Sequence, residues 1–316
     1  MPTTVLMFIG SLALLLVAAN FFTSAAERVG LRLGMSPFIV GVFIVAIGTS
    51  LPELVASVIS VRDGHSEIVA GNVLGANAAN LLLILGAVSI AVPGGRVLLG
   101  EQYLMIDLHF MLGAMMALGT AMADGHVTRV EGALLLVAYG IYVAYLLAEG
   151  RSASADASHA EALPDVTRGA WRDPAILLAS GIAIYFGGDL TVSSLATLAN
   201  ALGISPAIAS VTILSVGTTL PELAISVTAA RRGIAALAVG NILGSCVFNA
   251  LAVAGTGALI GGVDVPDALQ HFALPFVVAA TLLFYLLTLD KRISRWEGKL
   301  FLVLFALFIT KVANLG

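Results

Sequence analysis

Charged residues are scarce in this 316-residue sequence. Asp, Glu, Lys and Arg together make up 11% of it, whereas they make up about a quarter of a typical soluble domain. Hydrophobic residues reach 59% and the mean hydropathy is +1.03. Such a chain has too little polar surface to be covered by water, so an ordinary soluble domain is excluded and an integral membrane protein is predicted. The net charge of −4 gives no indication of nucleic-acid binding.

Cysteine is nearly absent as well, and histidine is not clustered. The chain has one cysteine, Cys246, and its five histidines show none of the paired spacing that zinc sites use. These are His65, His109, His126, His159 and His271. No HExxH zinc signature occurs, and no nucleophile is evidently paired with a base. We therefore expect neither an enzyme nor a bound cofactor.

Apolar runs follow one another from end to end, and each approaches the length needed to cross about 30 Å of hydrocarbon. The first run lacks the basic flank of a signal peptide, so we expect a helix there too. Ten runs are present, at residues 4–26, 35–61, 66–91, 102–122, 129–149, 174–200, 204–230, 235–260, 270–289 and 298–315. The predicted fold class is an all-α polytopic membrane protein with ten transmembrane helices.

The basic residues predict the orientation, because Lys and Arg in short loops tend to stay on the cytoplasmic side. Ten spans place both termini on one face. If that face is external, twelve basic residues lie inside and only three, Arg62, Arg129 and Lys311, lie outside. The inner set is Arg28, Arg32, Arg96, Arg151, Arg168, Arg172, Arg231, Arg232, Lys291, Arg292, Arg295 and Lys299. Both termini are therefore predicted to be external.

A ten-residue motif occurs twice in the chain. Residues 48–57 read GTSLPELVAS and residues 217–226 read GTTLPELAIS, an offset of 169 residues. The same offset relates GNVLGANAAN at 71–80 to GNILGSCVFN at 240–249, and Gly34 and Pro37 to Gly203 and Pro206. The sequence therefore predicts two five-helix repeats, 1–149 and 174–316, joined by a polar cytoplasmic linker at 150–173.

Because five is odd, the second repeat enters the membrane from the opposite side to the first. Inverted repeats of this kind commonly build secondary transporters. Their site lies near the bilayer midplane, where the repeats meet, and access to it alternates between the two sides. The predicted architecture thus indicates a transporter.

Each copy of the first motif places one glutamate in apolar surroundings. A lone carboxylate at the bilayer centre costs roughly 2.5–3.5 kcal/mol, so Glu53 and Glu222 need a cation or another compensating partner. The proline before each glutamate has no N–H and frees carbonyl groups about one turn earlier. Thr49 and Ser50 lie four and three residues before Glu53, on the same side of the helix. Each motif thus offers hydroxyl, carbonyl and carboxylate oxygens together.

This set of oxygens favours a hard cation. Ca²⁺ prefers six to eight oxygens with carboxylates among them, and Na⁺ uses similar neutral oxygens. In the second motif, Asn80 and Asn249 have amide groups that can either ligate a cation or donate to a glutamate, and both roles stay open. The glycines of this motif, Gly71 and Gly75 with Gly240 and Gly244, predict close helix packing.

At these two motifs the sequence resembles the calcium/cation antiporter superfamily, in particular its sodium/calcium exchanger branch with prokaryotic ten-helix members. The resemblance spans both halves. It implies exchange of intracellular Ca²⁺ for an external monovalent cation at a central site built by the second, third, seventh and eighth helices. The site residues that it implies are Glu53, Glu222, Thr49, Ser50, Thr218, Thr219, Asn80, Asn249 and Ser245, together with the backbone carbonyls of Ala46 and Ser215.

The chain departs from the family pattern at three positions. Many sodium/calcium exchangers carry Asp where this chain has Asn80 or Asn249, and Ser where it has Ala76. Two carboxylates suffice to neutralise one Ca²⁺, but the site is less charged. We expect Na⁺ as the coupling ion, with H⁺ as the alternative.

An empty, doubly charged site would be too costly to reorient across the membrane, which favours exchange over leak. Ca²⁺ and monovalent cations are the expected binding partners, in the lipid bilayer of a plasma membrane. No obligate protein partner is evident.

Overall fold

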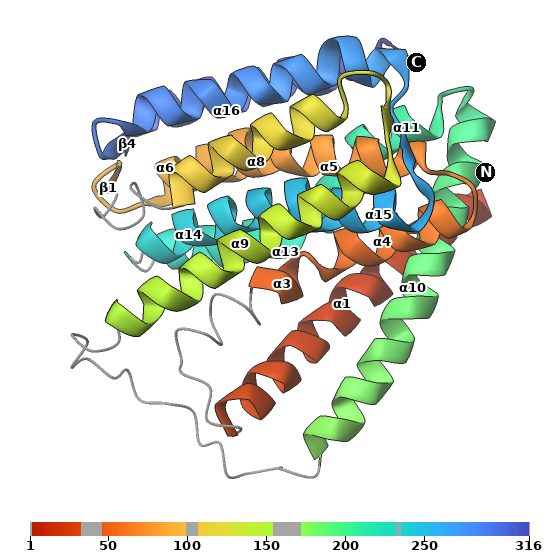
Figure 1. Cartoon of the computed structure of the whole chain (residues 1–316), viewed down its shortest axis with the longest axis horizontal. Coiled ribbons are helices and arrows are strands. Elements are labelled where there is room, and N and C mark those ends of the chain that lie inside the picture. Colours follow the sequence, from red (N-terminus) through yellow and green to blue (C-terminus); the bar gives the residue numbers. More distant parts are fainter. Residues whose placement is uncertain are drawn as a thin grey trace.

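Helices dominate the computed structural model, which describes residues 2–32, 46–98, 107–153, 172–231, 233 and 235–315 (Figure 1). The α-helices are α1 (Pro2–Arg32), α3 (Ala46–Thr49), α4 (Leu51–Arg62), α5 (Glu67–Ala78), α6 (Leu85–Ala91), α8 (Asp107–Ala121), α9 (Arg129–Ala153), α10 (Arg172–Leu202), α11 (Pro206–Ala209), α12 (Ser215–Thr218), α13 (Leu220–Arg231), α14 (Ala235–Val247), α15 (Ala254–Gly261), α16 (Leu274–Thr288) and α17 (Arg295–Ala313). Four π-helical stretches are η2 (Ala79–Ile84), η3 (Ser210–Leu214), η4 (Phe248–Val253) and η5 (Leu269–Ala273).

Several of these helices are long and apolar enough to cross a membrane. Six pass on length and composition, at Pro2–Gly30, Glu67–Ala91, Arg129–Ala148, Arg172–Leu202, Ala238–Gly261 and Leu269–Thr288. Pro206–Thr218 and Leu220–Arg231, bent by 43° at their junction, make a seventh if they count as one span. The prediction of an all-helical, multi-pass membrane protein is confirmed. Parts of the predicted runs at 35–45 and 102–106, Gly34, Pro37 and linker residues 154–171 lie outside the described residues.

The same local structure recurs at the offset of 169 residues. α3 and α4 are separated by Ser50, and α12 and α13 by Thr219. Both separating residues leave the helical region in the same way, with φ −94° and ψ 11° at Ser50 and φ −82° and ψ 4° at Thr219. The proline two residues later explains each break, because it cannot donate to the preceding turn. In Figure 1 the chain runs from α3 to α4 in one direction and from α11 to α13 in the opposite one.

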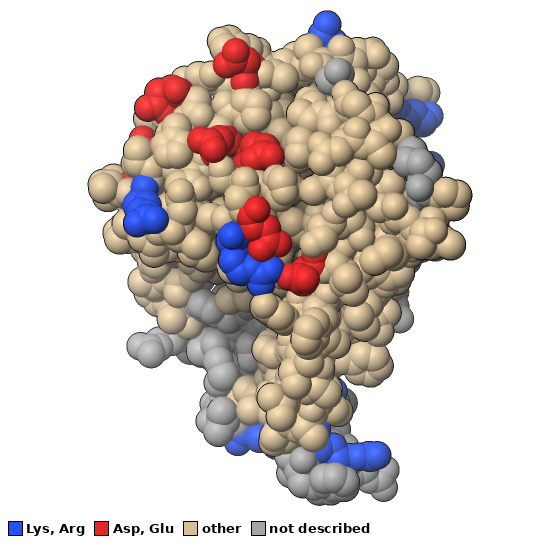
Figure 2. All heavy atoms as spheres, turned by 90° about the vertical axis from the view of Figure 1, so that its right-hand side faces the viewer, with Lys and Arg blue, Asp and Glu red and all other residues tan. Residues whose placement is uncertain are grey.

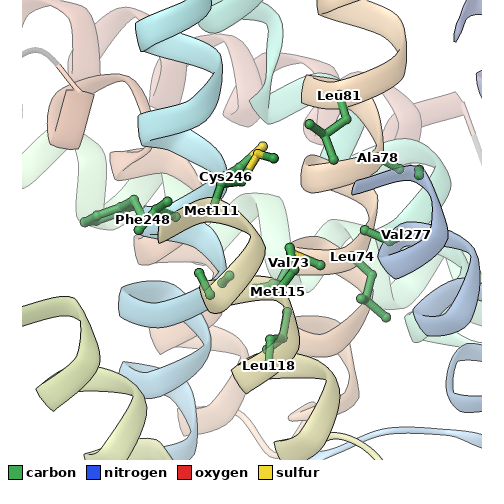
Figure 3. Packing of buried hydrophobic residues seen from close by; sticks show 14 of the residues in the cluster. Val73, Leu74, Ala78, Leu81, Met111, Met115, Leu118, Cys246, Phe248 and Val277 are labelled. Carbon is green, nitrogen blue, oxygen red and sulfur yellow. The ribbon is translucent and has the colours of Figure 1, made fainter. Parts of the chain in front are cut away.

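The centre of the molecule is formed by the two long segments that follow the broken helices. Glu67–Ala91 and Ala238–Gly261 are each 83% buried, whereas the other spans are mostly exposed. Apolar side chains of α5, α8, α14 and α16 meet there, among them Val73, Met115, Cys246 and Val277 (Figure 3). α1 and α10 pack along each other at the periphery (Figure 1). The broken helices therefore lie against a buried core.

Two small strand pairs join the loops of the two halves. β1 (Arg96–Leu98) pairs antiparallel with β4 (Arg292–Ser294), and β2 (His126–Val127) with β3 (Val263–Asp264). The β2–β3 pair belongs to the face that Figure 2 shows, where acidic side chains gather. Its exposed carboxylates include Asp63, Asp124, Asp264 and Asp267. The β1–β4 pair lies at the other end of the bundle and carries arginines (Figure 1).

Asp264 links three segments on the acidic face. Its carboxylate lies 2.8 Å from His126 Nδ1 and accepts a hydrogen bond of 2.9 Å from the Ser66 hydroxyl. The hydrogen bond with His126, followed by that from Ser66, holds the pKa of Asp264 below its ordinary value of 3.8. A lowered carboxyl pKa adds stability above the unfolded pKa, and this contribution is lost as pH falls through the folded pKa.

We therefore expect Asp264→Asn to lower the melting temperature slightly at pH 7, because an exposed pair is screened by water. The difference from the wild type should disappear as the pH falls below about 4. Thermal unfolding in detergent between pH 7 and 3 measures this. Asp267→Asn, which removes an exposed carboxylate on the same loop, is the control and should show no such convergence. A pH-independent difference for Asp264→Asn would contradict the linkage.

Candidate cation-binding site

The two glutamates lie in the first turns of α4 and α13, directly after the breaks at Ser50 and Thr219. Both are almost completely buried, Glu53 with 1% and Glu222 with 0% of its surface exposed. The break explains their position, since it turns the start of the second helix, with its glutamate, toward the middle of the bundle. Neither glutamate takes part in an ion pair among the described residues. The structure thus buries two carboxylates without a compensating cationic side chain.

Unpartnered polar atoms concentrate around these glutamates. Nine buried side-chain oxygen or nitrogen atoms of the described residues have no hydrogen-bond partner. Seven of them belong to Glu53, Glu222, Asn80 and Asn249. Buried polar atoms are almost always paired, because leaving one unpaired costs about 1–3 kcal/mol. Such a concentration at one place indicates a site whose polar partner is a ligand.

The site is assembled from both halves of the chain. The Ser50 hydroxyl, from the break before α4, donates to Glu222 Oε1 at 3.1 Å and lies 3.3 Å from Ser245 Oγ of α14. Thr49 lies beside the Glu222 carboxylate, and Thr218 lies beside that of Glu53. The contacts therefore cross between the halves in both directions, which places six predicted residues together.

The asparagines are placed by π-helical stretches. Asn80 is the second residue of η2 and Asn249 the second of η4. A π-helical turn shifts the side chains that follow it and is frequent at functional sites. α13 contacts η2 and α4 contacts η4, so each glutamate helix packs against the asparagine stretch of the other half. Both side chains are buried with all their amide atoms unpartnered.

The hydroxyls of α12 and the break after it point back to their own helix. Thr218 donates to the Leu214 carbonyl at 3.1 Å, and Thr219 donates to the Ser215 carbonyl at 2.9 Å. A hydroxyl that gives its proton to the backbone still has oxygen lone pairs for a cation. The Ser215 carbonyl also accepts from the Thr219 N–H at 3.1 Å. A cation at this carbonyl would share the oxygen with these donors.

The remaining predicted ligand is the Ala46 carbonyl, and Ala46 is the first residue of α3. Behind the glutamates, matching pairs support the site: Asn72 donates to the Glu53 carbonyl at 3.3 Å, and Asn241 donates to Ser226 Oγ at 3.1 Å. The serines that end the first motif, Ser57 and Ser226, were not predicted as part of this support. Their matched positions in the two motif copies were the signal that could have identified them.

The chemistry of the donor set fits a hard cation. Carboxylate, hydroxyl and amide oxygens of this kind suit Ca²⁺ or Na⁺. Among the described residues, no group of three or more His, Cys, Asp and Glu side chains could hold a metal ion. Cys246, in α14, is buried within the apolar core (Figure 3).

Comparison with known proteins agrees with this donor set. The family model described as sodium/calcium exchanger protein matches residues 3–148 and 173–313. The chain belongs to the sodium/calcium exchanger family. Both halves that contain the glutamates are covered by this match.

Individual members of the exchanger family align over nearly the whole chain. CaxA of Alkalimonas amylolytica is 32% identical over 313 residues, 96% of each protein. The sodium/calcium exchanger MaX1 of Methanosarcina acetivorans is 27% identical and covers 94% of this chain and 95% of its own. A solved structure of the sodium-calcium exchanger NCX_Mj matches with a TM-score of 0.67 and 28% identity, over 97% of both chains. The predicted family is confirmed, and its members are transporters rather than enzymes.

Proposed function

We propose that this chain is a secondary active antiporter that exchanges Ca²⁺ for monovalent cations, with Na⁺ favoured. The observation that carries the proposal is the set of unpartnered oxygens on Glu53, Glu222, Asn80 and Asn249 between the two halves. Ca²⁺ and the monovalent ions would compete for these oxygens. When the site is empty, two buried charges remain unpaired, and moving them across the bilayer is too costly for a leak.

The proposal includes an architecture of ten transmembrane helices in two inverted five-helix repeats, 1–149 and 174–316, with residues 150–173 as a cytoplasmic linker. The recurrence of the broken helix and of the π-helical stretch at one offset supports it. The opposite directions of α3 to α4 and α11 to α13 support the inversion (Figure 1). Alternating access would then expose the site near the midplane to one side at a time.

We further propose that both termini are external and that the membrane is the plasma membrane of the cell. The acidic face in Figure 2 carries the β2–β3 pair, and the arginine-bearing β1–β4 pair lies at the opposite end. Basic residues favour the cytoplasmic side, which supports an internal position for β1 and β4.

The experiment is Ca²⁺ uptake into proteoliposomes of the purified chain, driven in turn by an outward gradient of Na⁺, K⁺ or H⁺. We expect uptake with Na⁺ and none without a counter-gradient. If only H⁺ drives uptake, the two carboxylates are the proton carriers and the coupling is to protons instead. If none of the three ions drives uptake, the antiport proposal is wrong. Ca²⁺ entry without any counter-ion would indicate a channel.

A further inference from the structure

The two halves do not supply the same groups to the site, although their motifs match. At the offset of 169 residues, Ser50 corresponds to Thr219, Glu222 to Glu53, and Ser245 to Ala76. One half therefore has a serine where the other has a side chain without a polar atom. Ala76 and Ser245 are both completely buried, so water cannot take the place of the missing hydroxyl.

Hydrogen bonding follows this difference. A hydroxyl has one proton, and a chain in which Ser245 donates to Ser50 and Ser50 donates to Glu222 satisfies both observed contacts, of 3.3 and 3.1 Å. On the other side, the Thr219 hydroxyl turns away and lies 2.9 and 3.2 Å from the carbonyls of Ser215 and Val216 in its own helix. Opposite Ala76 there is no side-chain hydroxyl for Thr219 to bond.

The carboxylates differ accordingly. Glu222 Oε1 has a hydroxyl donor, whereas neither oxygen of Glu53 has a partner in the described part of the chain. Thr218 lies beside Glu53, but its proton is directed to the Leu214 and Ser215 carbonyls. A donor to a carboxylate offsets part of its charge and occupies a lone pair that a cation would otherwise use. Glu53 therefore has the greater need of a cation.

We propose that Glu53 is the principal anchor of the divalent cation, and that the Ala76/Ser245 difference makes the two glutamates unequal. This rests on the proposed function, since it concerns the same site. The Glu222 side, with its chain of two serine hydroxyls, holds the cation more weakly. Ala76 acts through Thr219 and Glu53 and is a positioning residue rather than a ligand.

The test compares Ca²⁺ affinities of purified Glu53→Gln and Glu222→Gln, measured by radiolabelled Ca²⁺ binding in Na⁺-free buffer. Gln has the shape of Glu, so both variants lose the same formal charge. We expect Glu53→Gln to weaken binding at least about tenfold more than Glu222→Gln, because the latter leaves the bare carboxylate in place.

Two further variants test the cause of the inequality. Ala76→Ser gives Thr219 a hydroxyl partner, and Ser245→Ala removes the partner of Ser50. In either background the gap between Glu53→Gln and Glu222→Gln should narrow by at least about threefold. Thermal unfolding of each Ca²⁺-free variant identifies any that fails to fold, and for such a background the other one supplies the result.

Equal affinities of Glu53→Gln and Glu222→Gln, or a reversed order, would overturn the proposal. So would a gap that stays unchanged in both backgrounds. Failure of the proposed function looks different: the wild-type chain itself would then neither bind nor transport Ca²⁺.

Discussion

Replacing both Glu53 and Glu222 by glutamine is expected to reduce Ca²⁺ exchange in proteoliposomes by at least about 100-fold. The double variant keeps the shape of the site and removes both of its charges. Leaving one member of a buried charge pair without its partner costs about 3–5 kcal/mol, and each 1.4 kcal/mol is a tenfold change in affinity. Without the carboxylates, a divalent cation at the site would be such an uncompensated charge.

The stability of the same double variant separates loss of binding from loss of folding. Two buried, unpartnered carboxylates destabilise the empty wild-type protein, so the variant should melt at a higher temperature in the absence of cations. Added Ca²⁺ should raise the melting temperature of the wild type and leave that of the variant unchanged. Glu67→Gln, in the first turn of α5 and outside the site, is the control. If the double variant exchanged Ca²⁺ at the wild-type rate, the site would be elsewhere.

Gly71→Ala is expected to destabilise the chain by about 1–3 kcal/mol, the usual cost of forcing an extra group into a packed core. A Cβ at Gly71 would lie 2.4 Å from the Ala207 carbonyl oxygen and 2.9 Å from Ser210 Cβ. The carbonyl is backbone and cannot rotate away, so α5 would have to move from α11. That movement would also strain the 2.7 Å hydrogen bond from Ser210 Oγ to the Ile68 carbonyl.

Thermal unfolding in detergent measures this effect, with Gly113→Ala as the matched control. Gly113 is also in a helix, α8, and no atom lies within 4 Å of its Cβ position. Alanine is favoured over glycine in a helix by about 0.5–1 kcal/mol, so the control should be neutral or slightly stabilising. Equal melting temperatures for the two variants would show that α5 and α11 are not closely packed.

Much of the site could be predicted from the sequence because its residues lie in duplicated motifs. The spacing of Thr49, Ser50 and Glu53 places their side chains together on any helix, and the prolines mark the breaks that the structure shows at Ser50 and Thr219. The small-xxx-small pattern correctly predicted the close contact at Gly71. Local chemistry is what fixed these features, so no knowledge of the tertiary structure was needed.

Other features depend on contacts between the halves, which spacing alone does not specify. The π-helical stretches that position Asn80 and Asn249 have no sequence signature of their own. Nor does matching of motifs reveal that Ser50 reaches Glu222 while Thr219 bonds its own backbone. The strand pairs joining loops as distant as Arg96 and Ser294 were not predicted either, since each strand has only two or three residues.

The most direct test of one shared site is equilibrium binding of radiolabelled Ca²⁺ to the purified chain over a range of Na⁺ concentrations. We predict that the wild-type chain binds a single Ca²⁺, that Na⁺ displaces it completely, and that raising Ca²⁺ shifts the displacement to higher Na⁺. The variant with glutamine at both positions 53 and 222 should bind none under the same conditions. Ca²⁺ that stays bound at saturating Na⁺, or that binds this variant with wild-type affinity, would contradict a shared site built on the two glutamates.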